Sequence, residues 1–412
     1  MINHEFKCRA CNSQNHKMIL DMGELPLANA FVKEPTDQDD QFIWPLSLVM
    51  CQDCDLLQIK DEMPREKLFS NYLWVTSTSS SAKKHAEWLS EHLWVEFGVN
   101  SHHEKPFLVE IASNDGFFLE HYRDAGFDIL GVDPSNLAEE ADNRGLTSIR
   151  DFFGKKVARH IIETKRQPDV IVARNVLGHS SELQDLVEGM DELLPPDGVM
   201  ILEMPYAFML NYETQYDTIF HEHLSYLTVG STSNLLARYG MKIVNAQFVD
   251  MNGGSILCEV RRTEHPTPEN HHALLSLENL IHLNTPFGWR NFSANTHRQR
   301  DELVTMLQKL RADKLSVLAY GAAAKFMTML NYCGIDTTLL GAVGDANPRK
   351  QGLLCPGVRI PVVAPSALME MNPDYVLIGA WNFKDEIINY LRKEFGYAGK
   401  FIVPLPLPEI ID

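Results

Sequence analysis

Leu108-Val-Glu-Ile-Ala-Ser-Asn-Asp-Gly116 is the stretch that decides the fold of this chain. A short apolar run ends at an acidic residue and leads into a polar turn, and Phe117-Phe-Leu-Glu-His-Tyr122 then opens a helix. Phe127-Asp-Ile-Leu-Gly-Val-Asp133-Pro134 follows as a second strand that ends in a carboxylate. This order of strand, turn, helix and strand predicts the first unit of a βαβ fold.

The turn and the second strand indicate a ligand that contains a ribose. A carboxylate such as Asp133 at the tip of the second strand can accept hydrogen bonds from both ribose hydroxyls, and the turn brings backbone close to a ligand at the helix N-terminus. The turn is not a dinucleotide fingerprint, because Ala112 and Ser113 stand where glycines would and only Gly116 remains. S-adenosylmethionine, which has no phosphate, fits this looser turn. The alternative is a generic Rossmann-like unit without a nucleoside ligand.

Further strand ends in this region supply more candidates for cofactor contacts. Arg150-Asp-Phe-Phe153 follows a short strand, and an acid beside an aromatic ring suits an adenine and its amino group. The segments 168–175 and 198–205 are also predicted strands. The carboxyl ends of parallel strands share one edge of the sheet, where α/β proteins bind their ligands. The predicted cofactor-binding residues are Glu110, Ala112, Asn114, Asp133, Pro134, Asp151, Phe152 and Asn175.

Length and composition bound the class of protein. The 412 residues are enough for two or three domains, and an apolar content of 45% supports sizeable cores. The net charge of −18 argues against non-specific binding to nucleic acid or to an anionic membrane, since both need a basic face. The polar start 1–8 is unlike a signal peptide, and no apolar run is long enough for a transmembrane helix. We therefore expect a soluble, cytoplasmic protein with no nucleic-acid or membrane partner.

Two C-x-x-C knuckles predict a metal site. Cys8-Arg-Ala-Cys11 and Cys51-Gln-Asp-Cys54 together offer the four thiolates that tetrahedral zinc requires. The gap between them is long for a zinc ribbon, so the insert, which includes Leu25-Pro-Leu-Ala-Asn-Ala-Phe31, must form a loop or a small subdomain. We favour structural zinc at Cys8, Cys11, Cys51 and Cys54 over free or redox-active thiols. No neighbouring feature suggests an open coordination position, so the module is expected to act as a scaffold or lid.

A histidine–carboxylate cluster, His221-Glu222-His223, follows the predicted cofactor unit. The two histidines lack the i, i+4 spacing of a zincin helix, which argues against a helical metal site. An extended segment would place His221 and His223 on one face and Glu222 on the other. We interpret the cluster as an acid–base site, because the substrate should enter after the cofactor domain. The alternative is a structural polar loop.

A second α/β unit begins at Leu315-Ser-Val-Leu-Ala-Tyr320-Gly-Ala-Ala-Ala-Lys325. Its turn of small residues closes on a lysine, which suits an anionic phosphate at a helix N-terminus, although this is not a Walker motif. The segments 339–350 and 373–382 add further strand ends, the first with a basic turn. An accessory Rossmann-like domain without a ligand is the alternative. Two nucleotide-type units around a histidine cluster instead suggest a cofactor on one side and a phosphorylated substrate on the other.

Together these motifs resemble those of the sugar C-methyltransferase family, whose members methylate a ring carbon of a nucleotide-linked keto-deoxy sugar. The resemblance covers nearly the whole chain, and it is the order and spacing of the motifs that make it specific. The motifs are the paired C-x-x-C knuckles, the turn 113–116, Asn175-Val-Leu-Gly-His179, His221-Glu-His-Leu-Ser-Tyr226 and Tyr320-Gly-Ala-Ala-Ala-Lys325.

The resemblance implies an α/β protein in three parts. Residues 1–70 would form a zinc-binding module, and residues 71–265 a Rossmann-like methyltransferase domain that binds S-adenosylmethionine, with a helical lead-in. Residues 266–412 would form a second Rossmann-like α/β domain that binds the nucleotide sugar. The implied substrate is a dTDP- or GDP-linked 4-keto-6-deoxy sugar, and the chain is expected to be a monomer or a weak oligomer.

The resemblance also implies a mechanism. The 4-keto group acidifies the proton on C3, a base removes it, and the resulting enolate attacks the sulfonium methyl group. His223 matches the base that is proposed for the family, and Glu222, Asn175 and His179 would position the sugar or assist with the proton and the enolate oxygen. Trp74 and Phe220 stand where family members commonly carry tyrosines. The implied substrate-binding residues are Trp74, Phe220, Tyr320, Lys325, Asp345, Asn347, Lys350 and Trp381.

The sequence therefore predicts an S-adenosylmethionine-dependent C-methyltransferase of a nucleotide-linked sugar, with structural zinc. One alternative is a methyltransferase that acts on another small molecule. A second is a zinc-containing binding protein whose methyltransferase domain has lost its chemistry.

Overall fold

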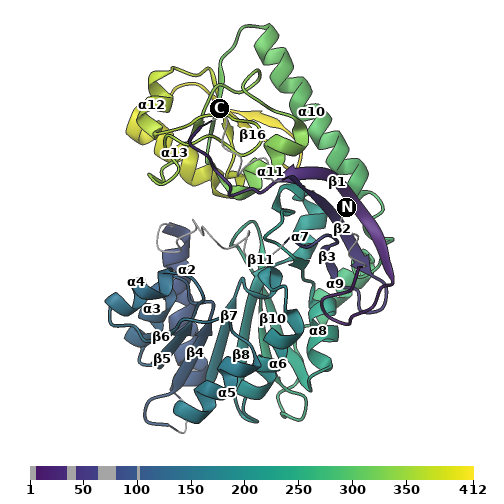
Figure 1. The fold of residues 1–412 in the computed structure, drawn as a ribbon, viewed down its shortest axis with the longest axis vertical. Helices are drawn as coiled ribbons and strands as arrows, with labels where there is room; N and C mark the ends of the chain where they lie inside the picture. The colour runs from purple at the N-terminus through teal and green to yellow at the C-terminus, as the bar shows by residue number, and fades with distance from the viewer. Residues whose placement is uncertain (1–5, 35–42, 64–79, 100–102) are drawn as a thin grey trace.

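The computed structural model describes residues 6–34, 43–63, 80–99 and 103–412 of the chain. Two lobes, each built on its own sheet, are connected along one side by the N-terminal strands (Figure 1). We call them the central lobe, built on a seven-stranded sheet, and the C-terminal lobe, built on a six-stranded sheet. The described residues before position 64 form the N-terminal module. Trp74, a predicted substrate contact, lies outside the described residues.

The central sheet has the order β10-β11-β8-β7-β4-β5-β6. Strands β6, β5, β4, β7 and β8 are parallel, while β11 is antiparallel to both of its neighbours. The strand order reverses between β4 and β7, and ligands of doubly wound sheets bind at the carboxyl ends of the strands at such a switch point. The strands are β4 Phe107–Ile111, β5 Asp128–Val132, β6 Ser148–Ile149, β7 Val170–Arg174, β8 Val199–Pro205, β10 Met241–Val249 and β11 Ser255–Arg262.

Alternate residues of β4 enter two different cores, which explains why the whole strand is buried. Leu108 packs with α2 and α3 on one face, whereas Phe107, Val109 and Ile111 pack with α5 and α6 on the other. A strand covered on both faces has a nearly continuous apolar sequence, and β4 is apolar except for Glu110. The helices are α2 Ser80–Leu93, α3 Phe117–Ala125, α4 Leu137–Asn143, α5 Lys155–Thr164, α6 Leu183–Leu193, α7 Ala207–Tyr212 and α8 Val229–Ala237.

The C-terminal lobe confirms the second α/β unit. Its sheet has the order β14-β13-β12-β15-β16-β17, parallel except for β17. Helices α9 and α10 occupy most of the polar segment that precedes it. The elements are α9 His272–Leu280, α10 Phe292–Ala312, β12 Val317–Tyr320, α11 Ala324–Cys333, β13 Val343–Gly344, β14 Val362–Val363, α12 Pro365–Glu370, β15 Tyr375–Ile378, α13 Lys384–Phe395, β16 Lys400–Val403 and β17 Glu409–Ile411.

The N-terminal module forms a four-stranded sheet whose last strand comes from far along the chain. Strands β1 His16–Pro26, β2 Ile43–Cys51 and β3 Leu57–Ile59 are antiparallel neighbours. The fourth strand is β9 Ser225–Tyr226, which pairs with β3 directly after the histidine cluster. The sequence analysis did not predict this pairing, because a two-residue strand carries no periodic signal.

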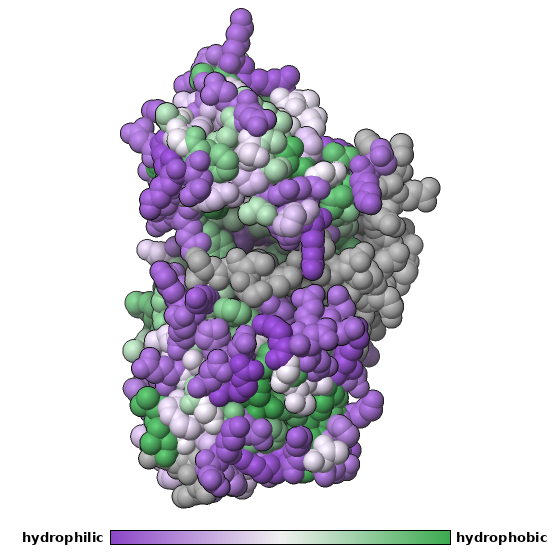
Figure 2. Space-filling model, turned by 90° about the vertical axis from the view of Figure 1, so that its left-hand side faces the viewer, coloured by the Kyte–Doolittle hydropathy of each residue, from purple (hydrophilic) through white to green (hydrophobic). Residues whose placement is uncertain are grey.

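The module also contacts the C-terminal lobe. Val32 and Leu354 exchange backbone hydrogen bonds of 3.2 and 2.7 Å, and the apolar side chains of β1 and β2 join the core that surrounds α11. Figure 1 shows β1 running beside α10 and α11. The face of the molecule in Figure 2 is mainly hydrophilic on the C-terminal lobe, and apolar side chains gather low on the central lobe. Within the described residues, no helix combines the length and apolar character needed to span a membrane.

Candidate active site

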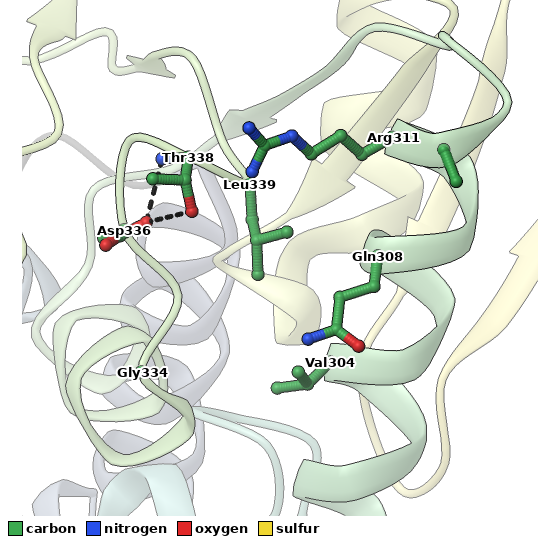
Figure 3. Close-up of a pocket in the computed structure, with 8 residues that line it drawn as sticks. Val304, Gln308, Arg311, Gly334, Asp336, Thr338 and Leu339 are labelled. Atoms are coloured by element: carbon green, nitrogen blue, oxygen red, sulfur yellow. Dashed lines mark hydrogen bonds between the residues drawn. The ribbon is translucent and has the colours of Figure 1, made fainter.

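A surface hollow of about 500 Å³ lies between α10 and the loop after α11 (Figure 3). Asp336 accepts hydrogen bonds in it from the backbone N–H of Thr338 at 2.8 Å and from its hydroxyl at 2.6 Å. These bonds form a local turn, and the hollow lies away from the carboxyl edges of both parallel sheets. We therefore place the candidate site at the sheet edges, where the predicted residues gather.

The turn after β4 has an unusual backbone. Ala112, Asn114 and Gly116 have φ values of 61°, 53° and 73°, in the left-handed region. Asn114 N–H donates to the Asp133 carboxylate at 2.9 Å, and Ser135 N–H donates to its other oxygen, also at 2.9 Å. The predicted strand-tip carboxylate is thus held directly over the turn, in a fixed orientation.

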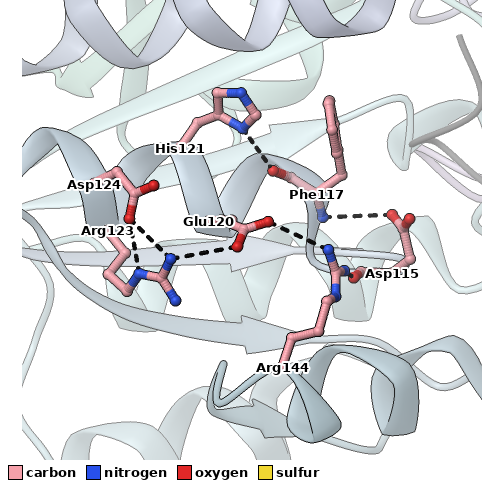
Figure 4. Close-up of polar contacts among 7 residues, drawn as sticks. All are labelled: Asp115, Phe117, Glu120, His121, Arg123, Asp124 and Arg144. Carbon is pink, nitrogen blue, oxygen red and sulfur yellow. Dashed lines mark hydrogen bonds and ion pairs between the residues drawn. The ribbon is translucent and has the colours of Figure 1, made fainter.

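Polar contacts along α3 hold this turn from outside (Figure 4). The Arg144 guanidinium donates to the backbone oxygen of Asp115 and pairs with Glu120 at 3.4 Å. Glu120 also pairs with Arg123 at 3.4 Å, and Phe117 N–H donates to the Asp115 carboxylate at 3.4 Å. The helix that follows the turn is therefore fixed relative to it.

A chain of buried polar side chains connects α2 with β8, β7 and β4. His85 of α2 contacts Glu203 at 2.6 Å, Glu203 contacts Arg174 at 3.4 Å, and Arg174 contacts Glu110 at 3.4 Å. Burial raises the pKa of Glu110 to about 8, because it outweighs the attraction of Arg174. For Glu203, burial acts in the same direction, but Arg174 and His85 outweigh it and lower the pKa. One oxygen of Glu110 is buried without a hydrogen-bond partner, which suits a cationic group of a ligand above β4.

The other predicted cofactor-binding residues occupy neighbouring strand ends. Asn175 follows β7 with a φ of 54°, and its side-chain oxygen is buried without a hydrogen-bond partner. Asp151 and Phe152 follow β6, and the Phe152 ring is 48% exposed, as a ring that stacks on a ligand must be in the ligand-free protein. Pro134 follows Asp133 directly after β5. All of these residues lie along the carboxyl edge of the central sheet.

His223 is held in one tautomer. Its Nδ1 lies 2.8 Å from the backbone oxygen of Thr218, and because a carbonyl only accepts, Nδ1 must carry the proton. In the neutral ring Nε2 therefore keeps its lone pair. Burial, followed by the influence of His179 and Lys325, lowers the pKa of His223 well below its usual value. The His179 ring stands nearly perpendicular at 4.8 Å between ring centroids, and burial lowers its pKa to about 4.

The extended conformation considered for the histidine cluster is wrong. His221 and Glu222 form a turn, closed by a hydrogen bond of 2.8 Å from His223 N–H to Phe220 O, because the chain must reverse before it enters β9. The two histidines accordingly have different partners. His221 is fully buried and donates from Nε2 to the Trp44 backbone oxygen at 3.1 Å, so it is a structural residue.

Glu222 lies where the N-terminal module and the two lobes meet. The Asn29 amide donates to both of its oxygens, at 2.8 and 3.0 Å. Burial raises the pKa of Glu222 to about 7, while Asn29 and Lys350 act in the opposite direction. Lys350 itself donates to Ala322 O in the C-terminal lobe at 2.7 Å.

The C-terminal lobe contributes a second polar group to this region. Lys325 donates to the Asn382 side chain at 2.9 Å and lies 4.6 Å from the centre of a Trp381 ring. Trp381 in turn donates from Nε1 to Asp217 at 2.6 Å, which connects the lobe to the loop that carries His223. Burial raises the pKa of Asp217 to about 6, although Lys325 opposes this shift.

The remaining predicted substrate-binding residues fall into two groups. Asp345 accepts from Ala322 N–H and Asn347 N–H, both at 2.7 Å, so its carboxylate holds the turn after β12 much as Asp133 holds the turn after β4. Phe220 and Tyr320 are buried packing residues, and the Phe220 ring lies 3.8 Å from the ring of His223.

Four thiol sulfurs gather at one end of the N-terminal sheet, those of Cys8, Cys11, Cys51 and Cys54. All lie within 4.8 Å of one another, and two of the distances are 3.5 and 3.6 Å. Tetrahedral zinc with bonds of about 2.3 Å places its sulfurs roughly 3.8 Å apart. Asn12 and Asp55, with φ values of 60° and 64°, close the two knuckles. The donor set therefore fits Zn²⁺.

The sequence analysis missed several residues of this region. Arg174 and Glu203 are charges inside or at the end of apolar strands, and a charge in such a place is a signal for a buried ion pair. Asn29 and Asp217 gave no usable signal, because their partners lie 193 and 164 positions away.

Three family models match the chain. A zinc binding domain matches residues 8–69, a methyltransferase domain matches residues 95–246, and a C-methyltransferase C-terminal domain matches residues 250–406. C-methyltransferase NovU from Streptomyces niveus is 31% identical over 409 residues, which make up 98% of this chain and 97% of NovU.

Two solved structures show a weaker likeness. Magnesium protoporphyrin IX methyltransferase from Synechocystis, solved with bound SAH, is 14% identical with a TM-score of 0.35, covering 45% of this chain and 88% of that one. The PH0226 protein from Pyrococcus horikoshii is 16% identical with a TM-score of 0.35, covering 48% of this chain and 97% of that one.

Proposed function

This chain belongs to the C-methyltransferase family, and from that premise we propose that it methylates C3 of a nucleotide-linked 4-keto-6-deoxy sugar. It is an S-adenosylmethionine-dependent enzyme with a zinc-binding domain. The proposal adds the substrate class, the methylated carbon and the base. Its domains would be the zinc module, the cofactor domain and a C-terminal domain that binds the nucleotide sugar.

The state of His223 carries the proposal. Its Nδ1 proton is committed to Thr218 O, so the neutral ring has Nε2 available to accept a proton. Methylation at carbon needs such a base, because a C–H bond must break before a C–C bond can form. Burial holds the pKa of His223 low in the free protein, and a bound anionic diphosphate would raise the affinity of the ring for a proton.

The reaction balances with one base. The C3–H bond breaks, its proton passes to His223 Nε2, and the electron pair is delocalised onto the 4-keto oxygen. C3 then forms a bond to the methyl carbon, and the pair of the broken S–C bond stays on sulfur. Bound S-adenosylmethionine supplies the electrophilic methyl group. Glu110, Asp133 and Asn175 would hold it at the carboxyl edge of the central sheet, with its cationic end toward the unpartnered Glu110 oxygen.

Two lysines of the C-terminal lobe support an anionic substrate. Lys325 and Lys350 lie near the histidine cluster, and burial lowers the pKa of each. Lys325 lies in the first turn of α11, whose N-terminus also favours an anion. A diphosphate would restore favourable charge pairing to both ammonium groups. These groups are the reason to prefer a nucleotide sugar over an uncharged small molecule.

Phe220 cannot donate a hydrogen bond to the enolate oxygen. Its ring lies 3.8 Å from that of His223 and carries no hydroxyl. The Asn175 amide is a donor for an enolate oxygen, whereas the single N–H of the neutral His179 ring already donates to the Glu222 backbone. Since stabilisation of this oxygen supplies much of the rate in such reactions, the Asn175 amide is proposed to provide it, with His179 positioning the sugar.

The test is transfer of a labelled methyl group. The folded protein is incubated with methyl-labelled S-adenosylmethionine and a panel of dTDP- and GDP-linked 4-keto-6-deoxy sugars, and the products are analysed by mass spectrometry. The expected result is one labelled product, with NMR placing the methyl group on C3. If cofactor-bound protein yields no product from any sugar, the substrate class is wrong, and a methyl group on another ring carbon would overturn the assignment of C3.

A further inference from the structure

The N-terminal module contacts the loop on both sides of His223. His221 donates to Trp44 O, and both oxygens of Glu222 accept from Asn29. On the other side, Ile59 N–H donates to Leu224 O at 3.0 Å, and β3 pairs with β9. His223 lies between these contacts, and its own ring turns to Thr218 and His179.

A hydrogen-bond relay connects the metal knuckle to this loop. Gln58 donates from its amide to the sulfur of Cys8 at 3.1 Å, and its amide oxygen accepts from Arg9 at 3.1 and 3.2 Å. Arg9 is the second residue of the first knuckle and is 8% exposed. Its guanidinium donates to Ile59 O at 2.8 Å and to Leu224 O at 3.4 Å. The residue beside His223 is thus two side chains away from a zinc ligand.

The Arg9 side chain is suited to holding several backbone segments together. The guanidinium is a rigid planar fork with five N–H donors, and here it serves several acceptors at once, including Glu62 at 3.0 Å. Burial makes the loss of the contacts to Gln58, Ile59 and Leu224 costly, since these acceptors would have no water to replace the guanidinium. The fork therefore fixes the distance between the knuckle, β3 and the catalytic loop.

We propose that the zinc module positions the catalytic base, with Arg9 and Asn29 as positioning residues for His223. This inference rests on the proposed function only in taking His223 as the base. The module is then part of the active site and more than a scaffold. Displacing a catalytic group by about 1 Å costs on the order of 100-fold in rate. A small shift of His223 after loss of an Arg9 or Asn29 contact should therefore lower the rate measurably.

The first test does not use the reaction. Hydrogen–deuterium exchange is measured on zinc-loaded Arg9→Met and Asn29→Ala proteins. We expect faster uptake in a peptide covering residues 219–227, with uptake in residues 107–117 and the affinity for S-adenosylmethionine unchanged. Gln52→Met is the matched control, because Gln52 holds the same place in the second knuckle but is exposed. Wild-type uptake in residues 219–227 of both variants would overturn the proposal.

Zinc content is measured on each variant. Should Arg9→Met lose the metal, Asn29→Ala still decides the question, because Asn29 lies outside the knuckles and contacts the loop directly. Removal of zinc from the wild-type chain with a chelator is expected to raise uptake in residues 219–227 before it affects residues 107–117. Equal and simultaneous exposure of both regions would mean that zinc supports the fold without a separate effect on the base.

A second test reads the base itself. With a substrate that wild-type protein methylates, exchange of the sugar C3 hydrogen with deuterated water is followed in the absence of methyl transfer. We expect Arg9→Met and Asn29→Ala to slow this exchange roughly 10- to 100-fold. Arg9→Lys should restore it only in part, since lysine keeps the charge but loses the fork. Wild-type exchange rates in both Arg9→Met and Asn29→Ala would reject the positioning role, whereas no exchange in the wild type would reject the proposed abstraction of the C3 proton before methyl transfer.

Discussion

At the scale of single residues, burial favours the neutral form of both a base, His223, and its neighbouring acid, Glu222. It lowers the pKa of His223 and raises that of Glu222 to about 7, so both are driven toward their neutral forms. The same holds for Lys325, whose pKa burial lowers. A site of this kind is prepared for a charged ligand that supplies the missing counter-charge.

Replacing His223, the proposed base, should separate chemistry from cofactor binding. His223→Ala removes Nε2 but leaves the turn after β4 untouched, so turnover should be abolished while the affinity for S-adenosylmethionine stays nearly unchanged. Methyl-label transfer and calorimetry measure the two quantities, with His160→Ala, an exposed position on α5, as the control. A parallel loss of both would count against the role as base.

Glu222 should make stability depend on pH. Its folded pKa, about 7, lies above the ordinary value of 4.5, so its favourable contribution is complete below pH 4.5 and is lost as the pH rises through 7. Glu222→Gln cannot ionise, so its stability relative to wild type should rise between pH 5 and pH 8, by at most about 3 kcal/mol. Urea denaturation of both zinc-loaded proteins measures this, and a constant or falling difference would contradict it.

At the scale of elements, the turn after β4 depends on the absence of a side chain at Gly116. A Cβ there would lie 2.8 Å from the side chains of both Ala141 and Leu146, and the φ of 73° is itself unfavourable for other residues. The helices α3 and α4 therefore approach each other more closely than a larger residue would allow. This close packing places the turn and the Asp133 carboxylate at the same edge.

Gly116→Ala should accordingly lower the unfolding free energy by more than the cost of the strained φ alone. Gly145→Ala is the matched control, because Gly145 has a similar φ of 76° but open space around its Cβ position. The control should lose about 1–2 kcal/mol of unfolding free energy from strain alone, and Gly116→Ala at least 1 kcal/mol more, with weaker binding of S-adenosylmethionine. Equal losses in chemical denaturation would mean that the neighbours yield without cost.

At the scale of the whole molecule, the N-terminal module belongs to two cores. Cys8, Cys54 and Leu56 pack into the core of the central lobe, while Leu20 and Leu48 join the core of the C-terminal lobe. The loop that carries His223 lies between these contacts. The relative placement of His223, the carboxyl edge of the central sheet and the two lysines therefore depends on a module that was expected to act as a scaffold or lid.

Loss of a zinc ligand should lower the stability of the whole protein. Cys54→Ser is expected to lose zinc and several kcal/mol of unfolding free energy. In such modules the free energy of metal binding stabilises the folded state, because the unfolded chain has no preformed site. Elemental analysis and thermal denaturation measure the two effects, and Cys258→Ala, away from the cluster, should keep its zinc. A metal-free wild-type chain with undiminished stability would exclude a structural role for the metal.

What the sequence determined by itself was local. The strand-and-turn segments 107–116 and 315–325, the strand-tip Asp133 and the paired knuckles each carry their signal within a few residues, so two α/β units and a four-cysteine zinc site followed from them and are confirmed. Only the tertiary structure decided the rest. The strand β9 in the N-terminal sheet, the buried chain from His85 to Glu110, and the contacts of Arg9 and Asn29 join residues far apart in sequence. Such contacts arise from the packing of lobes, and no local pattern encodes which distant partner a buried polar group will meet.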